Sequence, residues 1–227
     1  MGKDVTREQS QEAMARIMMN MPWDRIDSTM LQKKVIGNPK NFCDEIVDMI
    51  NGKPEQQAVP TEKFAVLIEL GVITVPDDYD HKTQLAKFFK KNRKKFYGIN
   101  DNITDENFQN PTRILKPGDK LRVTAYKQIV SGSTTSEERM KFLRSQNAVF
   151  TGAQGPSLVF EQKRDELPKG YWYGSFDEKD RLWKDSDGYL RVPRLGRYSV
   201  GVFYFDLGFF EFDWDDDNAF FCFRDVE

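Results

Sequence analysis

Residues 198–223 read YSVGVFYFDLGFFEFDWDDDNAFFCF, and no helical period survives in this stretch. Between Val202 and Leu207 the side chains alternate in character, which predicts a strand that turns Phe203, Phe205 and Leu207 to one face and the intervening residues to the other. The end of the chain is therefore expected to consist of strands joined by long connections.

The same stretch is rich in aromatic and acidic side chains. Of its 26 residues 11 are aromatic, and it carries six carboxylates but no Lys or Arg. A core does not easily bury so many large side chains next to carboxylates, so several are expected at the surface, where an aromatic and acidic patch is typical of a binding site. The alternative is an aromatic-rich core with an acidic loop.

The chain before residue 98 shows helical spacing instead. Helices are predicted at residues 6–21, 38–52, 61–71 and 80–96, the second with Asn38 as cap, a proline at the first helical position and glycine as stop. The sequence thus predicts a helical region over residues 1–97.

Residues 98–227 are predicted to form a separate domain. Residues 121–126 follow a turn and have the pattern of a strand, and capping boxes at Thr135 with Glu138 and at Ser175 with Glu178 predict two short helices. Because strands follow these helices, the predicted class is α+β.

The composition limits the classes of function. Hydrophobic residues make up 39% of the 227 residues and the net charge is −2, which indicates a globular protein without a bulk positive field for nucleic acid or an anionic membrane. The lysines around residues 87–95 are either a nucleic-acid patch or, as favoured here, the solvated face of a helix.

The two cysteines, Cys43 and Cys222, are not spaced as in a disulfide scaffold, a metal site or a redox motif. No signal peptide or membrane span is found, so residence in the cytoplasm is the default expectation.

The motifs of common enzymes are missing. His81 is the single histidine, and the sequence has no Gly-rich phosphate loop and no His-Glu-x-x-His. Residues 185–188, Asp-Ser-Asp-Gly, look like the start of a calcium loop, but the remaining ligands are absent and an ordinary turn is favoured. We therefore expect no catalysis, no cofactor and no metal. An enzyme that uses only Asp and Glu, and a structural assembly subunit, are the alternatives.

A compositional gap marks the C-terminal segment. Residues 185–227 contain no Lys, Gln or Met, although these types supply 39 of the preceding 184 residues and about nine would be expected here. Strand preference explains part of the gap. Random replacement of the adenines in AAC codons explains it better, because the resulting codons never encode Lys, Gln, Met, Glu or Trp.

The chain from about Phe64 to its end resembles the variable proteins of diversity-generating retroelements, as found in uncultivated small-genome bacteria and archaea. The resemblance covers about 70% of the chain and depends on short strings at residues 70–76, 110–113, 116–119, 151–155, 176–179 and 222–223. It implies a C-type lectin-like fold, shared with formylglycine-generating enzymes, in which a retroelement reverse transcriptase diversifies the C-terminal segment for ligand binding. The copper-binding cysteine pair of those enzymes is not matched, so their activity is not expected.

The codon argument divides this segment into fixed and displayed positions. Glu211 and Trp214 cannot arise from a mutagenised AAC codon and should belong to the fixed scaffold. Alternation, or a position near the closing strand, adds further inward positions to the scaffold: Phe203, Phe205, Leu207, Phe210, Ala219, Cys222 and Phe223. The hypervariable, ligand-facing candidates are Arg194, Tyr198, Val200, Val202, Tyr204, Asp206, Phe209, Phe212, Asp213, Asp215, Asp216, Asp217 and Asn218. The expected partner is a protein or another macromolecule, and not nucleic acid, because the acidic residues repel phosphate.

Overall fold

The computed structural model describes residues 63–199 and 201–226. These residues belong to one compact unit, Glu62–Glu227. The helices predicted at residues 6–21 and 38–52 lie outside the described residues. Among the residues described, no helix is long and apolar enough to cross a membrane.

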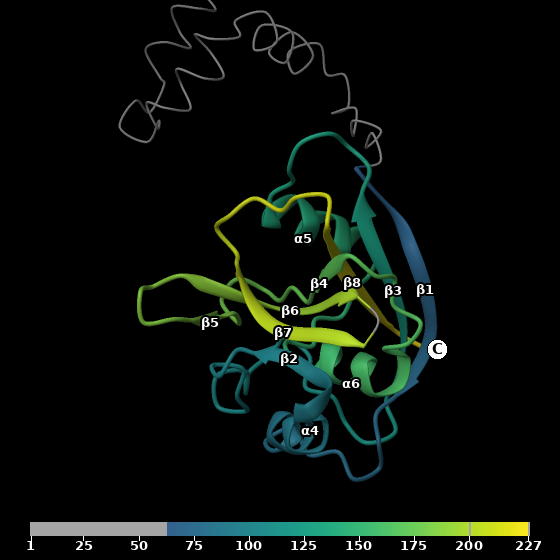
Figure 1. The fold of residues 1–227 in the computed structure, drawn as a ribbon, viewed down its shortest axis with the longest axis vertical. Coiled ribbons are helices and arrows are strands. Elements are labelled where there is room, and N and C mark those ends of the chain that lie inside the picture. Colours follow the sequence, from purple (N-terminus) through teal and green to yellow (C-terminus); the bar gives the residue numbers. More distant parts are fainter. Residues whose placement is uncertain (1–62, 200, 227) are drawn as a thin grey trace, which may run out of the picture. The chain divides into compact units, whose positions relative to one another are not determined.

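The described part has an α+β fold, built from one mixed sheet and three α-helices (Figure 1). In chain order the elements are β1 (Phe64–Thr74), α4 (Gln84–Asn92), the 3-10 helix η3 (Arg93–Lys95), β2 (Phe96–Ile99), β3 (Lys120–Gln128), α5 (Ser136–Ser145), α6 (Gln154–Lys163), β4 (Tyr171–Gly174), β5 (Trp183–Lys184), β6 (Leu190–Ser199), β7 (Val202–Phe209) and β8 (Asn218–Asp225).

The strands lie in the order β1-β3-β8-β4-β6-β7-β2, and β5 pairs with β6 outside this path. Only the β4–β8 and β2–β7 pairs are parallel. The last strand, β8, therefore lies in the interior of the sheet between β3 and β4. This position explains why six consecutive residues of β8 are buried.

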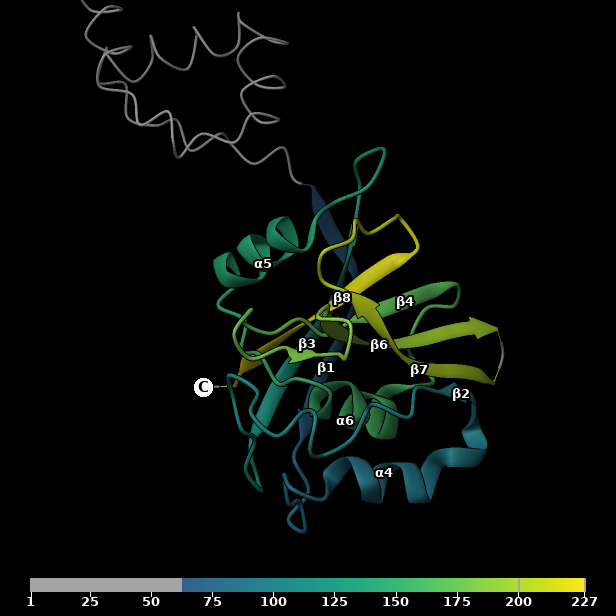
Figure 2. The ribbon, with the colours of Figure 1, turned by 90° about the vertical axis from the view of Figure 1, so that its left-hand side faces the viewer.

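Side chains of the sheet enter two hydrophobic clusters, one on each face. Helices α4 and α6 lie on one side of the sheet and helix α5 on the other (Figure 2). Helices α4 and α6 cover the first face, where Phe88 and Phe160 meet Phe221 and Phe223 of β8 in one cluster. Helix α5 and the loops around Phe176 and Trp214 cover part of the second face, toward which Phe220 and Cys222 point.

The alternation predicted for β7 is confirmed. Phe203, Phe205 and Leu207 are buried, whereas Val202, Tyr204 and Asp206 are only half-buried. Of the 11 aromatic residues between Tyr198 and Phe223, seven are buried: Phe203, Phe205, Phe210, Trp214, Phe220, Phe221 and Phe223. The sheet thus absorbs more of this segment than the composition indicated, and four aromatic side chains remain partly or largely exposed.

The predicted helix at residues 61–71 is wrong, because Phe64–Thr74 forms the edge strand β1. The pairing of β1 with β3 is shifted twice, between Val66 and Ile68 and between Glu69 and Gly71. Each such bulge adds one residue and breaks the alternation of the strand. The apolar residues consequently have a spacing that imitates a helix.

The helix predicted over residues 80–96 is shorter than expected. Helix α4 starts at Gln84, and its first amide groups, those of Leu85 and Ala86, donate to the carboxylate of Asp105 at 2.8 and 3.0 Å. Asp80 instead accepts from Thr83 in the preceding turn. With β1 and β2 both in the sheet, the described residues before 98 are not purely helical.

The two predicted capping boxes have different outcomes. Thr135 and Glu138 form the capping box that begins α5, as predicted. No helix follows Ser175, because its hydroxyl donates to the Gly152 carbonyl and Glu178 pairs with Arg144. Helix α6 was not predicted: seven of its ten residues are buried, so it lacks the polar face that helical periodicity detects.

Candidate ligand-binding surface

The second face of the sheet carries a row of five residues that crosses five strands. Gly98 pairs with Tyr204, Tyr204 with Gly196, Gly196 with Trp172, and Trp172 with Asn218. Paired residues point to the same side of a sheet. We call this set the aromatic row.

Glycines make room for the two rings of the aromatic row. A Cβ atom on Gly196 would lie 2.8 Å from the ring of Trp172, and a Cβ atom on Gly98 would lie 3.1 Å from the ring of Tyr204. The rings therefore lie over neighbouring backbone instead of standing upright. They are 5.6 Å apart between centroids and form a continuous aromatic surface.

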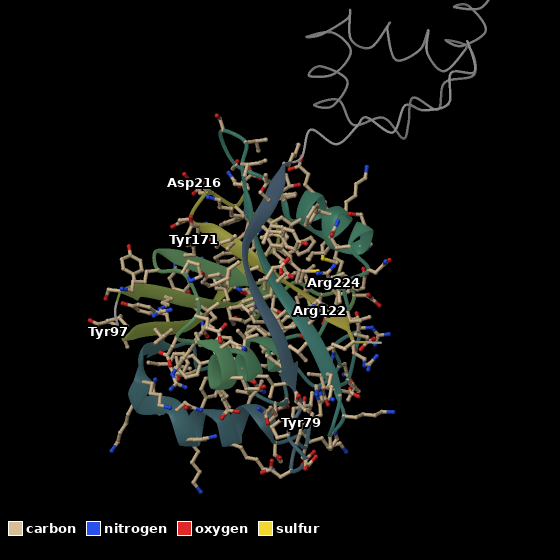
Figure 3. All side chains as sticks on the ribbon, turned by 90° about the vertical axis from the view of Figure 1, so that its right-hand side faces the viewer. Tyr79, Tyr97, Arg122, Tyr171, Asp216 and Arg224 are labelled. Atoms are coloured by element: carbon tan, nitrogen blue, oxygen red, sulfur yellow. The ribbon has the colours of Figure 1, made fainter. Side chains whose placement is uncertain are left out.

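Two more tyrosines extend this surface. The rings of Tyr97 and Tyr198 lie 5.4 and 6.3 Å from the ring of Tyr204, and their residues are 80% and 67% exposed. Figure 3 shows Tyr97 and Asp216 on the same side of the molecule, away from Arg122 and Arg224. Tyr97 and Trp172 lie outside the C-terminal segment, and the sequence analysis did not select them because their neighbours carry no distinctive motif.

A charged pair borders the aromatic row. Arg194 lies over the ring of Trp172, with its guanidinium carbon 4.3 Å from the centroid, and donates to Asp206 at 2.8 Å. Asn100 also donates to this carboxylate. Burial raises the pKa of Asp206, but the hydrogen bonds, first that from Arg194, outweigh it and bring the pKa below its ordinary value. Asp206 is thus ionised and occupied by internal partners.

The positions predicted to face a ligand are mostly accessible. Six are exposed, namely Tyr198, Phe212, Asp213, Asp215, Asp216 and Asp217; five are half-buried, namely Arg194, Val202, Tyr204, Asp206 and Phe209; Asn218 is buried, and Val200 lies outside the described residues. Asn218 is buried because it begins β8 inside the sheet. Among the predicted scaffold positions Trp214 is buried but Glu211 is exposed, and the Glu211 carboxylate accepts from the Leu190 amide.

The candidates do not all meet at one place. Tyr198, Tyr204, Arg194 and Asp206 lie with the aromatic row. Phe209 and Phe212 stack on each other at 4.6 Å together with Tyr189, and Arg191 lies 3.5 Å from the Phe209 centroid. Phe209 has the opposite parity to Tyr204 along β7, so this second cluster points to the other face of the strand.

A buried arginine holds the acidic loop between β7 and β8. Arg139 of α5 is fully buried and donates to the carbonyl oxygens of Asn218 at 2.6 Å and Asp215 at 3.5 Å. It also donates to the side chains of Thr134 and Gln128. Burial lowers the pKa of Arg139 to about 9, and nearby Asp215 and Asp217 act in the opposite direction, so the guanidinium remains charged at neutral pH. The sequence analysis missed this residue, which in an amphipathic helix looks like a surface cation.

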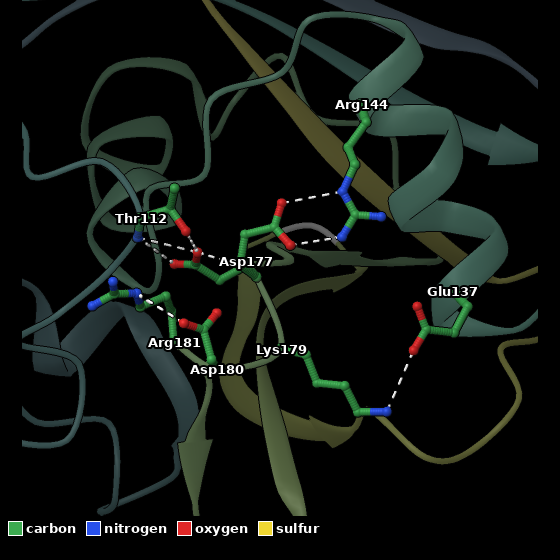
Figure 4. A network of polar contacts seen from close by, with 8 residues as sticks. Thr112, Glu137, Arg144, Asp177, Lys179, Asp180 and Arg181 are labelled. Carbon is green, nitrogen blue, oxygen red and sulfur yellow. Dashed lines mark hydrogen bonds and ion pairs between the residues drawn. The ribbon is translucent and has the colours of Figure 1, made fainter.

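Three of the six strings that carry the resemblance, at residues 110–113, 151–155 and 176–179, meet around Asp177, whose bonds to Thr112 are drawn in Figure 4. The Asp177 carboxylate accepts from the amide and hydroxyl of Thr112 and from the Glu178 amide. Burial raises the pKa of Asp177, while these hydrogen bonds act against it. A Cβ atom on Gly152 would lie 3.2 Å from Pro111. Three loops are thus fixed together by internal bonds, which indicates a structural function for these strings.

His81 and Asp185 both have internal partners. His81 contacts the Tyr79 hydroxyl at 3.0 Å and the Gln109 carbonyl at 3.1 Å, so both ring nitrogens have partners. No group of three or more His, Cys, Asp or Glu residues within the described ranges has the arrangement of a metal site. Asp185 accepts from the amides of Asp187 and Tyr189 and from Arg191, which makes residues 185–188 a turn, as predicted.

The chain matches no family model, no curated protein and no solved structure. The surface described above is therefore interpreted from its own residues.

Proposed function

We propose that this protein binds ligands without catalysis, through a C-terminal surface that a retroelement reverse transcriptase diversifies. The observation that carries the proposal is the coincidence of two patterns in one segment. The segment lacks the residue types that mutagenised AAC codons exclude, apart from Glu211, Trp214 and Glu227, and its exposed side chains are largely the positions left for display.

The fold is proposed to be of the C-type lectin-like type. Support comes from the mixed sheet, from the long connections that precede and follow its strands, and from the meeting of three of the six strings around Asp177. Such a scaffold separates the two tasks of the chain. Buried strand positions maintain the fold, while loops and outward strand positions contact the ligand.

The proposed ligand is a protein or another macromolecule. Tyrosine and tryptophan supply a large contact area at a small cost in side-chain entropy, which suits a surface that must bind different partners. The flat aromatic row also suits an interface better than a closed pocket does. Nucleic acid is disfavoured, because Asp213, Asp215, Asp216 and Asp217 are exposed and repel phosphate.

The test is genetic and structural. A reverse-transcriptase gene and an imperfect template repeat should lie beside this gene, with mismatches at template adenines in the codons of the display positions. The template repeat should encode Glu and Trp at the positions of Glu211 and Trp214. Absence of any repeat, or mismatches concentrated in codons for buried residues such as Phe205 and Ala219, would contradict the proposal and favour an enzyme or an assembly subunit.

A second experiment tests display itself. Replacing Tyr198, Asp213 and Asp216 by alanine should leave the melting temperature within a few degrees, because surface substitutions usually change stability by less than about 0.5 kcal/mol each. Unfolding of this variant would favour the aromatic-core interpretation instead.

A further inference from the structure

The aromatic row is not confined to the C-terminal segment. Gly98 and Trp172 come from β2 and β4, and Tyr97 adjoins the row from β2. These residues precede the region that lacks Lys, Gln and Met, and so they keep their identity when that region changes.

We propose that Tyr97 and Trp172 are fixed anchors of the binding surface, and that the partner is a protein with acidic groups facing one end of the row and basic groups facing the other. This inference rests on the proposed function. It adds which residues of the surface stay constant, and in which order acidic and basic groups lie on the partner.

The exposure of Tyr97 supports its use as an anchor, and the half-buried Trp172 adjoins it through Tyr204. Tyr97 is 80% exposed although it lies in a strand of the sheet, and its ring packs only on the edge of the cluster with Tyr204. Large aromatic side chains at the centre of an interface commonly supply most of the binding energy. The row extends over four strand-to-strand steps, about 19 Å, which fits within a standard interface of roughly 800 Å² per partner.

The charges at the two ends of the row have opposite sign. The basic residues Arg93–Lys95 directly precede β2, and all three are exposed. At the other end, residues 213–217 directly precede Asn218 and carry four exposed carboxylates, none of which forms an ion pair with a described residue.

This polarity discriminates between classes of partner. A nucleic acid or an anionic membrane has one sign of charge, and the acidic end would repel it. A protein surface can present both signs in the matching order, and such complementarity orients a partner and accelerates its association. Arg194 already lies over the ring of Trp172, so an internal cation covers part of this ring.

The inference can be tested by panning a phage-displayed library of random 16-residue peptides on the full-length chain. The affinity of enriched peptides is then measured for the wild-type chain and for Tyr97→Ser, Trp172→Leu and Tyr189→Ser. Tyr189→Ser is the matched control, because it removes a tyrosine that is 42% exposed, belongs to the second cluster and is not among the display positions. Circular dichroism and thermal unfolding identify any variant that is not folded.

We expect Tyr97→Ser and Trp172→Leu to weaken binding at least tenfold and Tyr189→Ser less than twofold, with Asp or Glu and Lys or Arg gathered at opposite ends of the peptides. Peptides of a single charge sign would overturn the proposed polarity. If Trp172→Leu does not fold, the peptide affinity of Tyr97→Ser alone decides whether the row anchors the partner, because Tyr97 is highly exposed.

A second pair of variants separates this inference from the proposed function. Tyr198→Ser and Asp216→Asn change the displayed segment alone. Loss of binding in these variants, with Tyr97→Ser and Trp172→Leu unaffected, would overturn the inference and leave the proposed function standing. Loss of binding only in the Tyr97 and Trp172 variants would overturn the proposed function. If no peptide is enriched, or if neither set of variants loses binding, both the proposed function and this inference are overturned.

Discussion

Arg139 offers the sharpest test of how the acidic loop between β7 and β8 is held. Replacing it by methionine preserves most of the apolar volume but removes the donors to the Asn218 and Asp215 carbonyl oxygens. Hydrogen bonds to a charged group contribute about 1.5–3 kcal/mol each, so losing these two costs roughly 3–6 kcal/mol, although the Asp215 carbonyl keeps the Asn218 amide as a donor. Relief from burying a charge offsets part of this cost. The expected loss for Arg139→Met is therefore about 3 kcal/mol.

The assay is urea and thermal unfolding of the full-length chain. For a domain of this size the melting temperature should fall by roughly 6–12 °C, since 1 kcal/mol corresponds to about 2–4 °C. Arg144→Met is the matched control on the same helix. The side chain of Arg144 is half-exposed, and its pair with Glu178 should contribute less than about 1 kcal/mol.

Amide hydrogen exchange shows where Arg139→Met loosens the structure. Amide exchange at residues 215–218 should accelerate in Arg139→Met more than exchange in β3, because the loop loses its carbonyl partners first. A stability change below about 1 kcal/mol, or uniform acceleration across the sheet, would refute the idea that this guanidinium holds the loop.

Three further predictions follow from buried groups. Gly196→Ala should lower stability by about 1–3 kcal/mol and shift the Trp172 indole signal in NMR spectra, since its Cβ would meet that ring at 2.8 Å; an unshifted signal would contradict the geometry. Asp177→Ala should cost about 2–4 kcal/mol by urea unfolding and Asp177→Asn distinctly less, because Asn keeps an acceptor for Thr112; equal losses would show that the charge matters more than the acceptor. Stability should fall as pH rises from about 8.5, the unfolded thiol pKa, toward 11, because burial raises the pKa of Cys222 to about 11 and the folded state favours the neutral thiol; Cys222→Ala should flatten this fall, by at most about 1.4 kcal/mol per pH unit.

The sequence predicted best where one side of an element is buried. Strand β7 alternates strictly because its outward face is partly solvated, and α5 carries a complete capping box, so both could be located from the residues alone. Strand β1 could not, because its two bulges change the period on which the assignment depends. Helix α6 is buried on most sides and so has no periodic signal.

The candidate surface was predictable only in part. Outward positions of β7 and the acidic loop follow from alternation and charge, but Trp172 and Tyr97 join them through strand order. The parallel pairing of β4 with β8 and of β2 with β7 brings together segments far apart in sequence. A local pattern contains no information on that pairing. The buried state of Asn218 has the same origin, because it depends on β8 lying inside the sheet.

Trp214 links the argument from codons with the argument from packing. Its residue type is unreachable by the proposed mutagenesis, and its ring is buried against Gly208, where a Cβ atom would lie 2.5 Å away. Its indole donates to the Ser136 hydroxyl at 2.7 Å at the start of α5, and Arg139 lies over the ring. Because Arg139 in turn holds the loop carbonyls, the fixed Trp214 and the fixed helix α5 position the backbone of residues 215–218. Side chains on this loop can then change while its course stays the same, which is the property that a diversified binding surface requires.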